Sequence, residues 1–176
     1  RQLFELTDRD AAAIDGWMAD LRDQRRFRVD ERTFARLREA YRGDSVDNAT
    51  CLATIKEVYD KHNYLIDPHT AVAWTAGQNL RGSNPLLIAS TAHWAKFGGD
   101  VYRALHGIAA GDALPAEVAD LTGCQLNQLI ANETGSSIPR GLAELDEMPV
   151  RFTEVIDGTQ DAIEEAALGF SIQQRA

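Results

Sequence analysis

Two neighbouring hydroxyl side chains, Ser90 and Thr91, are the residues whose type and position could best do chemistry in this sequence. They follow a short, continuously apolar run over residues 85–89, which predicts a strand covered on both faces. In open α/β sheets the carboxyl ends of the strands line the ligand crevice, so hydroxyls at this position are well placed to meet a ligand. They are equally well placed to cap the helix that follows, and the sequence alone leaves both interpretations open.

Histidine and cysteine are weaker candidates for chemistry. The four histidines show no spacing typical of a metal pair, and the two cysteines give neither a disulfide framework nor a metal motif. We therefore expect no metal site and two reduced thiols. The residues concerned are His62, His69, His93, His106, Cys51 and Cys124.

A Ser-His-Asp hydrolase can be assembled on paper from Ser90, His93 and Asp67, but no Gly-x-Ser-x-Gly elbow supports it. The glycine pair at 98–99 lies inside a helix pattern and not after a strand, so it lacks the context of a phosphate-binding loop. None of the three lysines lies in a glycine-flanked loop of the kind that a cofactor-binding lysine needs. By itself the chain therefore offers no catalytic centre.

The local pattern predicts the elements that position the two hydroxyls. Asp67 is expected to cap a helix by accepting the amide of Thr70, with Pro68 at the first helical position and Gly82 at the stop. After the predicted strand, a helix is expected from Trp94 to near residue 107. Further helices are expected over roughly 8–25, 30–43, 47–62, 115–121 and 124–132 and after residue 158, with an edge strand over 150–156.

Composition bounds the broad class of protein. The chain has 176 residues and a formal net charge of −9, with 26% charged and 44% hydrophobic residues, which suits one domain with a real core. The acidic balance argues against a nucleic-acid binder, and acidic residues are interleaved with the arginines of residues 22–42, which indicates a solvated, ion-paired surface. No apolar run is long enough to span a bilayer. The chain opens without Met or a signal-peptide pattern, so we expect a cytoplasmic protein whose natural N-terminus lies elsewhere.

Residues 65–72 and 90–97 closely resemble two blocks near the C-terminal end of threonine synthases, which are pyridoxal-phosphate enzymes of the tryptophan-synthase-β-like fold. The order and the separation of the two blocks agree with the family. One departure is Trp94, where the family usually has proline. The likeness is strongest over about residues 45–107, and it implies a helix-rich α/β fold in which residues 1–176 form a single partial domain, with a few strands of a sheet packed by helices.

The resemblance also implies a site. The end of the strand would meet the pyridine ring of pyridoxal phosphate, with Thr91 as the first choice and Ser90 as the second choice for the hydroxyl that bonds the ring nitrogen. A hydroxyl leaves that nitrogen largely neutral, whereas an acid would keep it protonated. The full enzyme would convert O-phospho-L-homoserine and water to L-threonine and phosphate in threonine biosynthesis. Its lysine would remove the Cα and Cβ protons before γ-elimination of phosphate and addition of water.

The lysine and the phosphate-binding glycine loop of the family lie upstream of anything present here. The resemblance therefore implies that this chain contains no catalytic residue, is inactive alone and does not bind pyridoxal phosphate by itself. A partial domain would also expose a sheet edge, so self-association is expected for a fragment. The alternative from another class is a stand-alone, mostly helical interaction or regulatory domain without chemistry.

Overall fold

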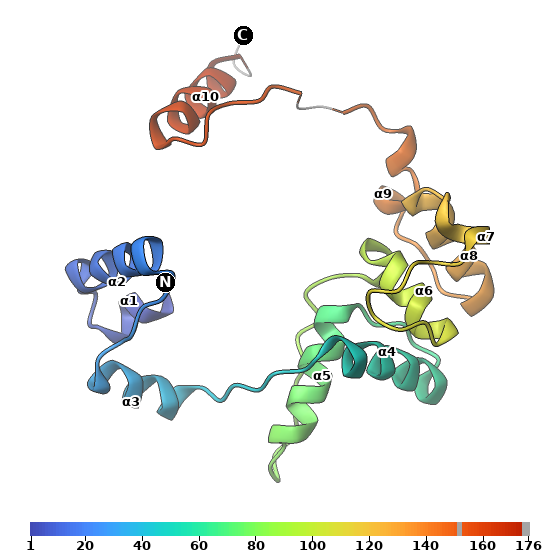
Figure 1. The fold of residues 1–176 in the computed structure, drawn as a ribbon, viewed down its shortest axis with the longest axis horizontal. Coiled ribbons are helices and arrows are strands. Elements are labelled where there is room, and N and C mark those ends of the chain that lie inside the picture. Colours follow the sequence, from blue (N-terminus) through green and yellow to red (C-terminus); the bar gives the residue numbers. More distant parts are fainter. Residues whose placement is uncertain (151–152, 174–176) are drawn as a thin grey trace.

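The computed structural model describes residues 1–150 and 153–173, and within these ranges it contains helices and no strand. Figure 1 shows three groups of helices along the chain: α1–α3, then α4–α9, then α10 by itself. The helix-rich part of the predicted fold class is thus confirmed. The α-helices are α1 (Gln2–Leu6), α2 (Ala11–Gln24), α3 (Glu31–Ala40), α4 (Asn48–His62), α5 (Pro68–Leu80), α6 (Gly98–His106), α7 (Ala116–Ala119), α8 (Gly123–Thr134), α9 (Arg140–Ala143) and α10 (Gln160–Gln173), and the 3₁₀ helices are η1 (Trp94–Lys96) and η2 (Leu145–Glu147).

The predicted sheet is not confirmed. Residues 85–89 have no regular secondary structure, and Leu87 is 96% exposed where a strand covered on both faces was predicted. A strand needs a neighbour to pair its N–H and C=O groups, and no other strand is present in the described parts of the chain. Of the predicted edge strand at 150–156, residues 151–152 lie outside the described residues and 153–156 form no strand.

The aspartates that were predicted to begin helices do so. The carboxylates of Asp30, Asp47 and Asp67 accept backbone amides at distances of 2.7 to 2.9 Å, which satisfies N–H groups that lack partners within the helix. The start of α2 differs from the prediction, because Asp10 is its cap and accepts the amide of Ala13 at 3.1 Å. Asp8 and Arg9 have left-handed backbone angles, with φ of 58° and 70°, and this interrupts the helix that was expected from residue 8.

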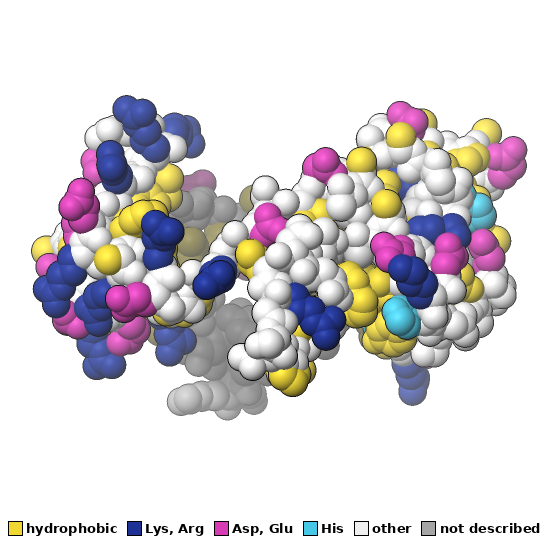
Figure 2. All heavy atoms as spheres, turned by 90° about the horizontal axis from the view of Figure 1, so that it is seen from below, with side chains coloured by type: hydrophobic (Ala, Val, Ile, Leu, Met, Phe, Trp, Pro, Cys, Tyr) yellow, Lys and Arg dark blue, Asp and Glu magenta, His cyan; other side chains and the backbone are white. Residues whose placement is uncertain are grey.

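The N-terminal helices form a small group of their own. Asp8 pairs with Arg32 at 3.1 Å and with Arg36 at 3.0 Å, which ties the end of α1 to α3. Figure 2 shows the basic side chains at the left of the molecule with acidic side chains among them, as the interleaved sequence indicated. These pairs are exposed to solvent, so each contributes between a few tenths of a kcal/mol and about 1 kcal/mol to the free energy of unfolding.

No helix in the described residues is long and apolar enough to cross a membrane.

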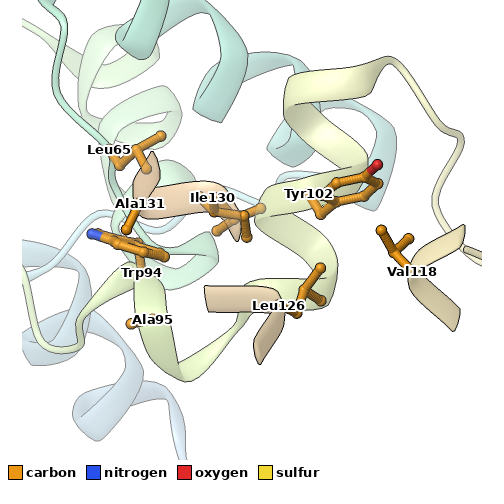
Figure 3. Close-up of a cluster of buried hydrophobic side chains, with 9 residues drawn as sticks. Leu65, Trp94, Ala95, Tyr102, Val118, Leu126, Ile130 and Ala131 are labelled. Atoms are coloured by element: carbon orange, nitrogen blue, oxygen red, sulfur yellow. The ribbon is translucent and has the colours of Figure 1, made fainter. Parts of the chain in front are cut away.

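Two hydrophobic clusters lie in the central group, and α6 contributes to both. One cluster joins α4, α5 and α6 around Ile55 and Ala104. The other joins η1, α6 and α8 around Trp94, Val101 and Ile130, and Figure 3 shows most of its side chains. The neighbours Leu65 and Ile66 enter different clusters. The short segment between α4 and α5 is therefore fixed from both sides just before residue 67.

Gly98, the first residue of α6, is required by close packing against α8. The buried amide of Asn127 donates from Nδ2 to the carbonyl oxygen of Ala95 at 2.6 Å. A Cβ on Gly98 would lie 2.3 Å from Asn127 Oδ1, whereas a Cβ on Gly99 would meet only Arg103 Nη1 at an ordinary 3.4 Å. The two adjacent glycines thus differ in what surrounds them.

Replacing Gly98 by alanine should lower the free energy of unfolding by about 2 kcal/mol, because the core of α6 and α8 must shift to admit the new methyl group. The matched variant Gly99→Ala should be neutral or stabilising by up to about 1 kcal/mol, since alanine favours a helix over glycine. Urea denaturation of the two variants measures the difference. Equal destabilisation by both would contradict the packing described here.

Candidate functional site

A polar groove of about 320 Å³ opens where three segments meet: the link between α4 and α5, the residues before α6 and the end of α8. Ser90 lines this groove, and Thr91, although adjacent and exposed, does not. The lining residues are Asn63, Tyr64, Leu65, Ile66, Asp67, Ser90, Ala92, His93, Trp94, Thr134, Gly135, Ser136 and Ser137.

Asp67 is one of the lining residues, and its side chain is completely buried. One carboxylate oxygen, Oδ1, accepts the amide of His69 at 2.9 Å and lies 3.2 Å from His69 Nδ1. The other oxygen, Oδ2, accepts a short hydrogen bond from Thr70 Oγ1. The carboxylate therefore combines the helix cap of α5 with contacts to two side chains of the first helical turn.

These hydrogen bonds keep Asp67 ionised. Burial raises the pKa of the Asp67 carboxyl, but the hydrogen bonds from the Thr70 hydroxyl and from the amides and side chain of residues 69–70 favour the charged form and leave the pKa below its usual range. A buried carboxylate is tolerated only when its oxygens are satisfied in this way. Asp67 is therefore an acceptor-only group at neutral pH.

The hydroxyl of Ser90 is held by this cluster. Ser90 Oγ lies 3.0 Å from Thr70 Oγ1 and 3.3 Å from the carbonyl oxygen of Ala92. The predicted capping role is not formed, because η1 is capped by His93 and the N-cap position of α6 is Phe97. Ser90 and Thr91 thus form an exposed corner, held from below by Asp67 and Thr70.

The side chain of His93 accepts a hydrogen bond from the backbone. Its Nδ1 accepts the amide of Ala95 at 3.2 Å, so the neutral ring carries its proton on Nε2. Burial lowers the pKa of His93 below its ordinary value, since the raising effect of Asp67 is smaller and Lys96 lowers the pKa further. Because the hydrogen bonds of Ser90, His93 and Asp67 run to other partners, the hydrolase arrangement considered from the sequence is not formed.

The apolar run before the corner contacts α5 through Leu86. The Leu86 side chain lies against Gly77, where a Cβ would come within 2.7 Å of Leu86 Cδ2. Leu86 itself remains 43% exposed and Leu87 is 96% exposed. Two leucine side chains are therefore exposed in the segment just before the hydroxyl corner.

The sequence did not indicate that residues 134–137 would join the site. Gly135 ends α8 in a left-handed conformation with φ of 70°, and the hydroxyl of Thr134 donates to the carbonyl oxygen of Ile130. This turn brings Ser136 and Ser137 to the groove. Only the Thr-Gly-Ser-Ser composition hinted at a polar turn, and composition does not reveal its distant neighbours. Trp94, at the position where the resemblance leads us to expect proline, packs into the hydrophobic core and also lines the groove.

Comparisons with known proteins agree with one another. Residues 70–129 match the family described as "Threonine synthase, C-terminal". Threonine synthase of Pseudomonas aeruginosa is 32% identical over 123 residues, which are 69% of this chain and 26% of that protein. Threonine synthase of Eremothecium gossypii is 28% identical over 180 residues, which are 97% of this chain and 32% of that protein.

A solved structure is also similar. It is the PLP-bound threonine synthase from Brucella melitensis, with a TM-score of 0.56 and 33% sequence identity over 68% of this chain and 25% of that chain. These similarities define the class of protein as the C-terminal region of threonine synthases. The chain belongs to the threonine synthase family, as a C-terminal part. It spans about a quarter to a third of the two threonine synthases compared above.

Replacing Asp67 by asparagine should lower the free energy of unfolding by about 2 kcal/mol at pH 7, because one amide nitrogen would face the hydroxyl and amide donors. The folded pKa of Asp67 is depressed, so its contribution is present above the unfolded pKa of about 4 and is lost as the pH falls through the folded pKa. The difference between the two proteins should therefore shrink in acid.

Denaturant titrations from pH 7 to pH 3 measure this difference. The control is Asp47→Asn at the exposed cap of α4, where asparagine caps about as well as aspartate. If Asp67→Asn lowers the free energy of unfolding only slightly, or by an amount that does not change with pH, the role described for the carboxylate is contradicted.

Proposed function

We propose that the chain is the C-terminal part of a pyridoxal-phosphate-dependent threonine synthase, which converts O-phospho-L-homoserine and water to L-threonine and phosphate. In this proposal Ser90 and Thr91 form one wall of the cofactor site. The observation that carries it is the exposed hydroxyl corner beside a polar groove, in a chain whose relatives are threonine synthases. Threonine biosynthesis in the cytoplasm is the setting that this function implies.

The residues at the corner fit one part of the cofactor. A neutral hydroxyl can bond the pyridine nitrogen without forcing it to be protonated, and the groove wall offers further hydroxyls at Ser136 and Ser137. Among its lining residues there is neither lysine nor arginine, which suits the ring of the cofactor better than its phosphate. When bound, pyridoxal phosphate supplies an electron sink for carbanion chemistry at the substrate.

The described residues of this chain would orient the ring and exclude water from one side of it. In this proposal the proton-transferring lysine comes from a part of the enzyme outside residues 1–176. Two of the three lysines are engaged elsewhere, because Lys56 pairs with Asp60 and Lys61 pairs with Glu57 on the surface of α4. Lys96 is exposed and does not line the groove. The isolated chain is accordingly proposed to be inactive and to bind no pyridoxal phosphate.

The apolar run over residues 85–89 is proposed to become a strand in the complete protein. Leu87 is almost fully exposed, and the residues from 83 to 92 take part in no backbone–backbone hydrogen bond. Such a segment suits addition to the edge of a sheet, with the upstream part of the same protein as its partner. Without that partner, pairing between two copies would cover the same surface.

The helix-only architecture of the described residues favours a second candidate, a stand-alone interaction domain without catalysis. The two candidates differ in their cofactor. A full-length protein of the proposed function binds pyridoxal phosphate and shows its absorption, whereas an interaction domain does neither.

In the full-length protein, Thr91→Val should weaken pyridoxal-phosphate binding about tenfold, because one hydrogen bond of about 1 to 1.5 kcal/mol is lost while the shape is kept. Cofactor titration followed by absorbance measures the affinity. The matched control is Thr153→Val at an exposed position that does not line the groove. Equal affinity of the Thr91 variant and the control would remove Thr91 from the site.

The strand proposal predicts a different response in the chain and in the full-length protein. Leu87→Asp should change the stability of the isolated chain by less than about 0.5 kcal/mol, because the side chain is already exposed. In the full-length protein the same change should cost about 2 kcal/mol or more, since it buries a charge in a sheet. Equal, small effects in both proteins would show that residue 87 stays in solvent.

A further inference from the structure

The hydrogen bonds below the groove have a direction that follows from elementary chemistry. Asp67 is ionised and can only accept. Thr70 Oγ1 makes its short contact with Asp67 Oδ2, so the single hydroxyl proton of Thr70 is used there. In the 3.0 Å contact between Thr70 Oγ1 and Ser90 Oγ, threonine must therefore accept and serine must donate.

The direction is the same for the second contact of Ser90. Its other partner is the carbonyl oxygen of Ala92 at 3.3 Å, which can only accept. The proton of Ser90 is thus directed into the protein, with Thr70 Oγ1 as its nearer acceptor and the carbonyl oxygen of Ala92 as a second, longer one. The oxygen of Ser90 consequently faces the groove with lone pairs alone, whereas Thr91 is exposed and makes no hydrogen bond from its hydroxyl to other described residues.

We propose that Asp67 is a positioning residue that acts through Thr70: it fixes Ser90 as a hydrogen-bond acceptor toward the groove and leaves Thr91 as the hydroxyl that donates. This inference rests on the proposed function for its ligand. A neutral pyridine nitrogen is an acceptor and can be satisfied only by a donor, so it pairs with Thr91. Ser90 receives a donor group of the ligand or a bound water.

The series of hydrogen bonds from Ser90 through Thr70 to Asp67, called the relay below, is tested on the chain itself. Carbon-13 NMR of the Asp67 carboxyl gives its pKa in the wild type, in Thr70→Val and in Thr70→Ser. The pKa should rise in the valine variant, which removes the donated hydrogen bond, and should stay near the wild-type value in the serine variant, which keeps it. The titratable groups that interact with Asp67 are His69, His93 and Cys51, and none of them is changed.

Thr70 is buried, so the valine variant is first checked for folding by its amide spectrum. Ser90→Ala gives a second test at an exposed position. Removing the proton that Ser90 donates should raise the pKa of Asp67 in the same direction, by less than Thr70→Val does. A pKa of Asp67 that is unchanged in both Thr70→Val and Ser90→Ala would overturn the inferred relay.

The consequence for the ligand is tested in the full-length protein with pyridoxal phosphate as the probe. Thr70→Val should weaken cofactor binding about tenfold and change the pH profile of the cofactor absorbance, while Thr70→Ser should restore both. Thr91→Val should have a larger effect than Ser90→Ala, and the reverse order would overturn the assignment of donor and acceptor. If the wild-type protein binds no pyridoxal phosphate, the proposed function fails, whereas the relay measured on the chain is judged separately by NMR.

Discussion

The buried carboxylate of Asp67 is the constraint on which the candidate site depends. Its oxygens cap α5, hold the hydroxyl of Thr70 and contact the ring of His69. An ionised group in this position would be costly without these partners, so the local structure is strongly determined. The two hydrophobic clusters fix the backbone next to Asp67, since Leu65 and Ile66 pack into different cores. Through Thr70 this rigidity reaches Ser90 at the surface.

The rest of the central helices serve to place this corner. Helix α6 joins both cores, and its close approach to α8 at Gly98 and Asn127 brings the end of α8 to the groove. The groove is therefore assembled from three segments far apart in the sequence. Leu87, three residues before Ser90 of the groove wall, is exposed, which is consistent with a further part of the protein covering this segment in the proposed enzyme. In the proposed enzyme this wall would hold the cofactor ring, and other parts of the protein would supply the proton-transferring groups.

Short-range interactions were predictable from the sequence and long-range ones were not. Asp30, Asp47 and Asp67 cap helices through amides two or three residues away, so their role can be inferred from neighbouring residues. The strand predicted at 85–89 is not formed, because a strand needs a pairing partner and the described residues contain no other strand. The contact between Thr70 and Ser90, and the approach of residues 134–137, depend on tertiary packing. The roles of Ser90 and Thr91 as cofactor ligands stay predictions.

The central claim is that an ionised, buried aspartate holds one hydroxyl inward and leaves its neighbour free for the cofactor ring. A crystal structure of the full-length protein with pyridoxal phosphate tests it most directly. The account predicts Thr91 Oγ1 within about 2.7 to 3.2 Å of the pyridine nitrogen, with Ser90 Oγ still bonded to Thr70. A ring nitrogen bonded to another residue, with Ser90 and Thr91 facing away from the cofactor, would contradict it.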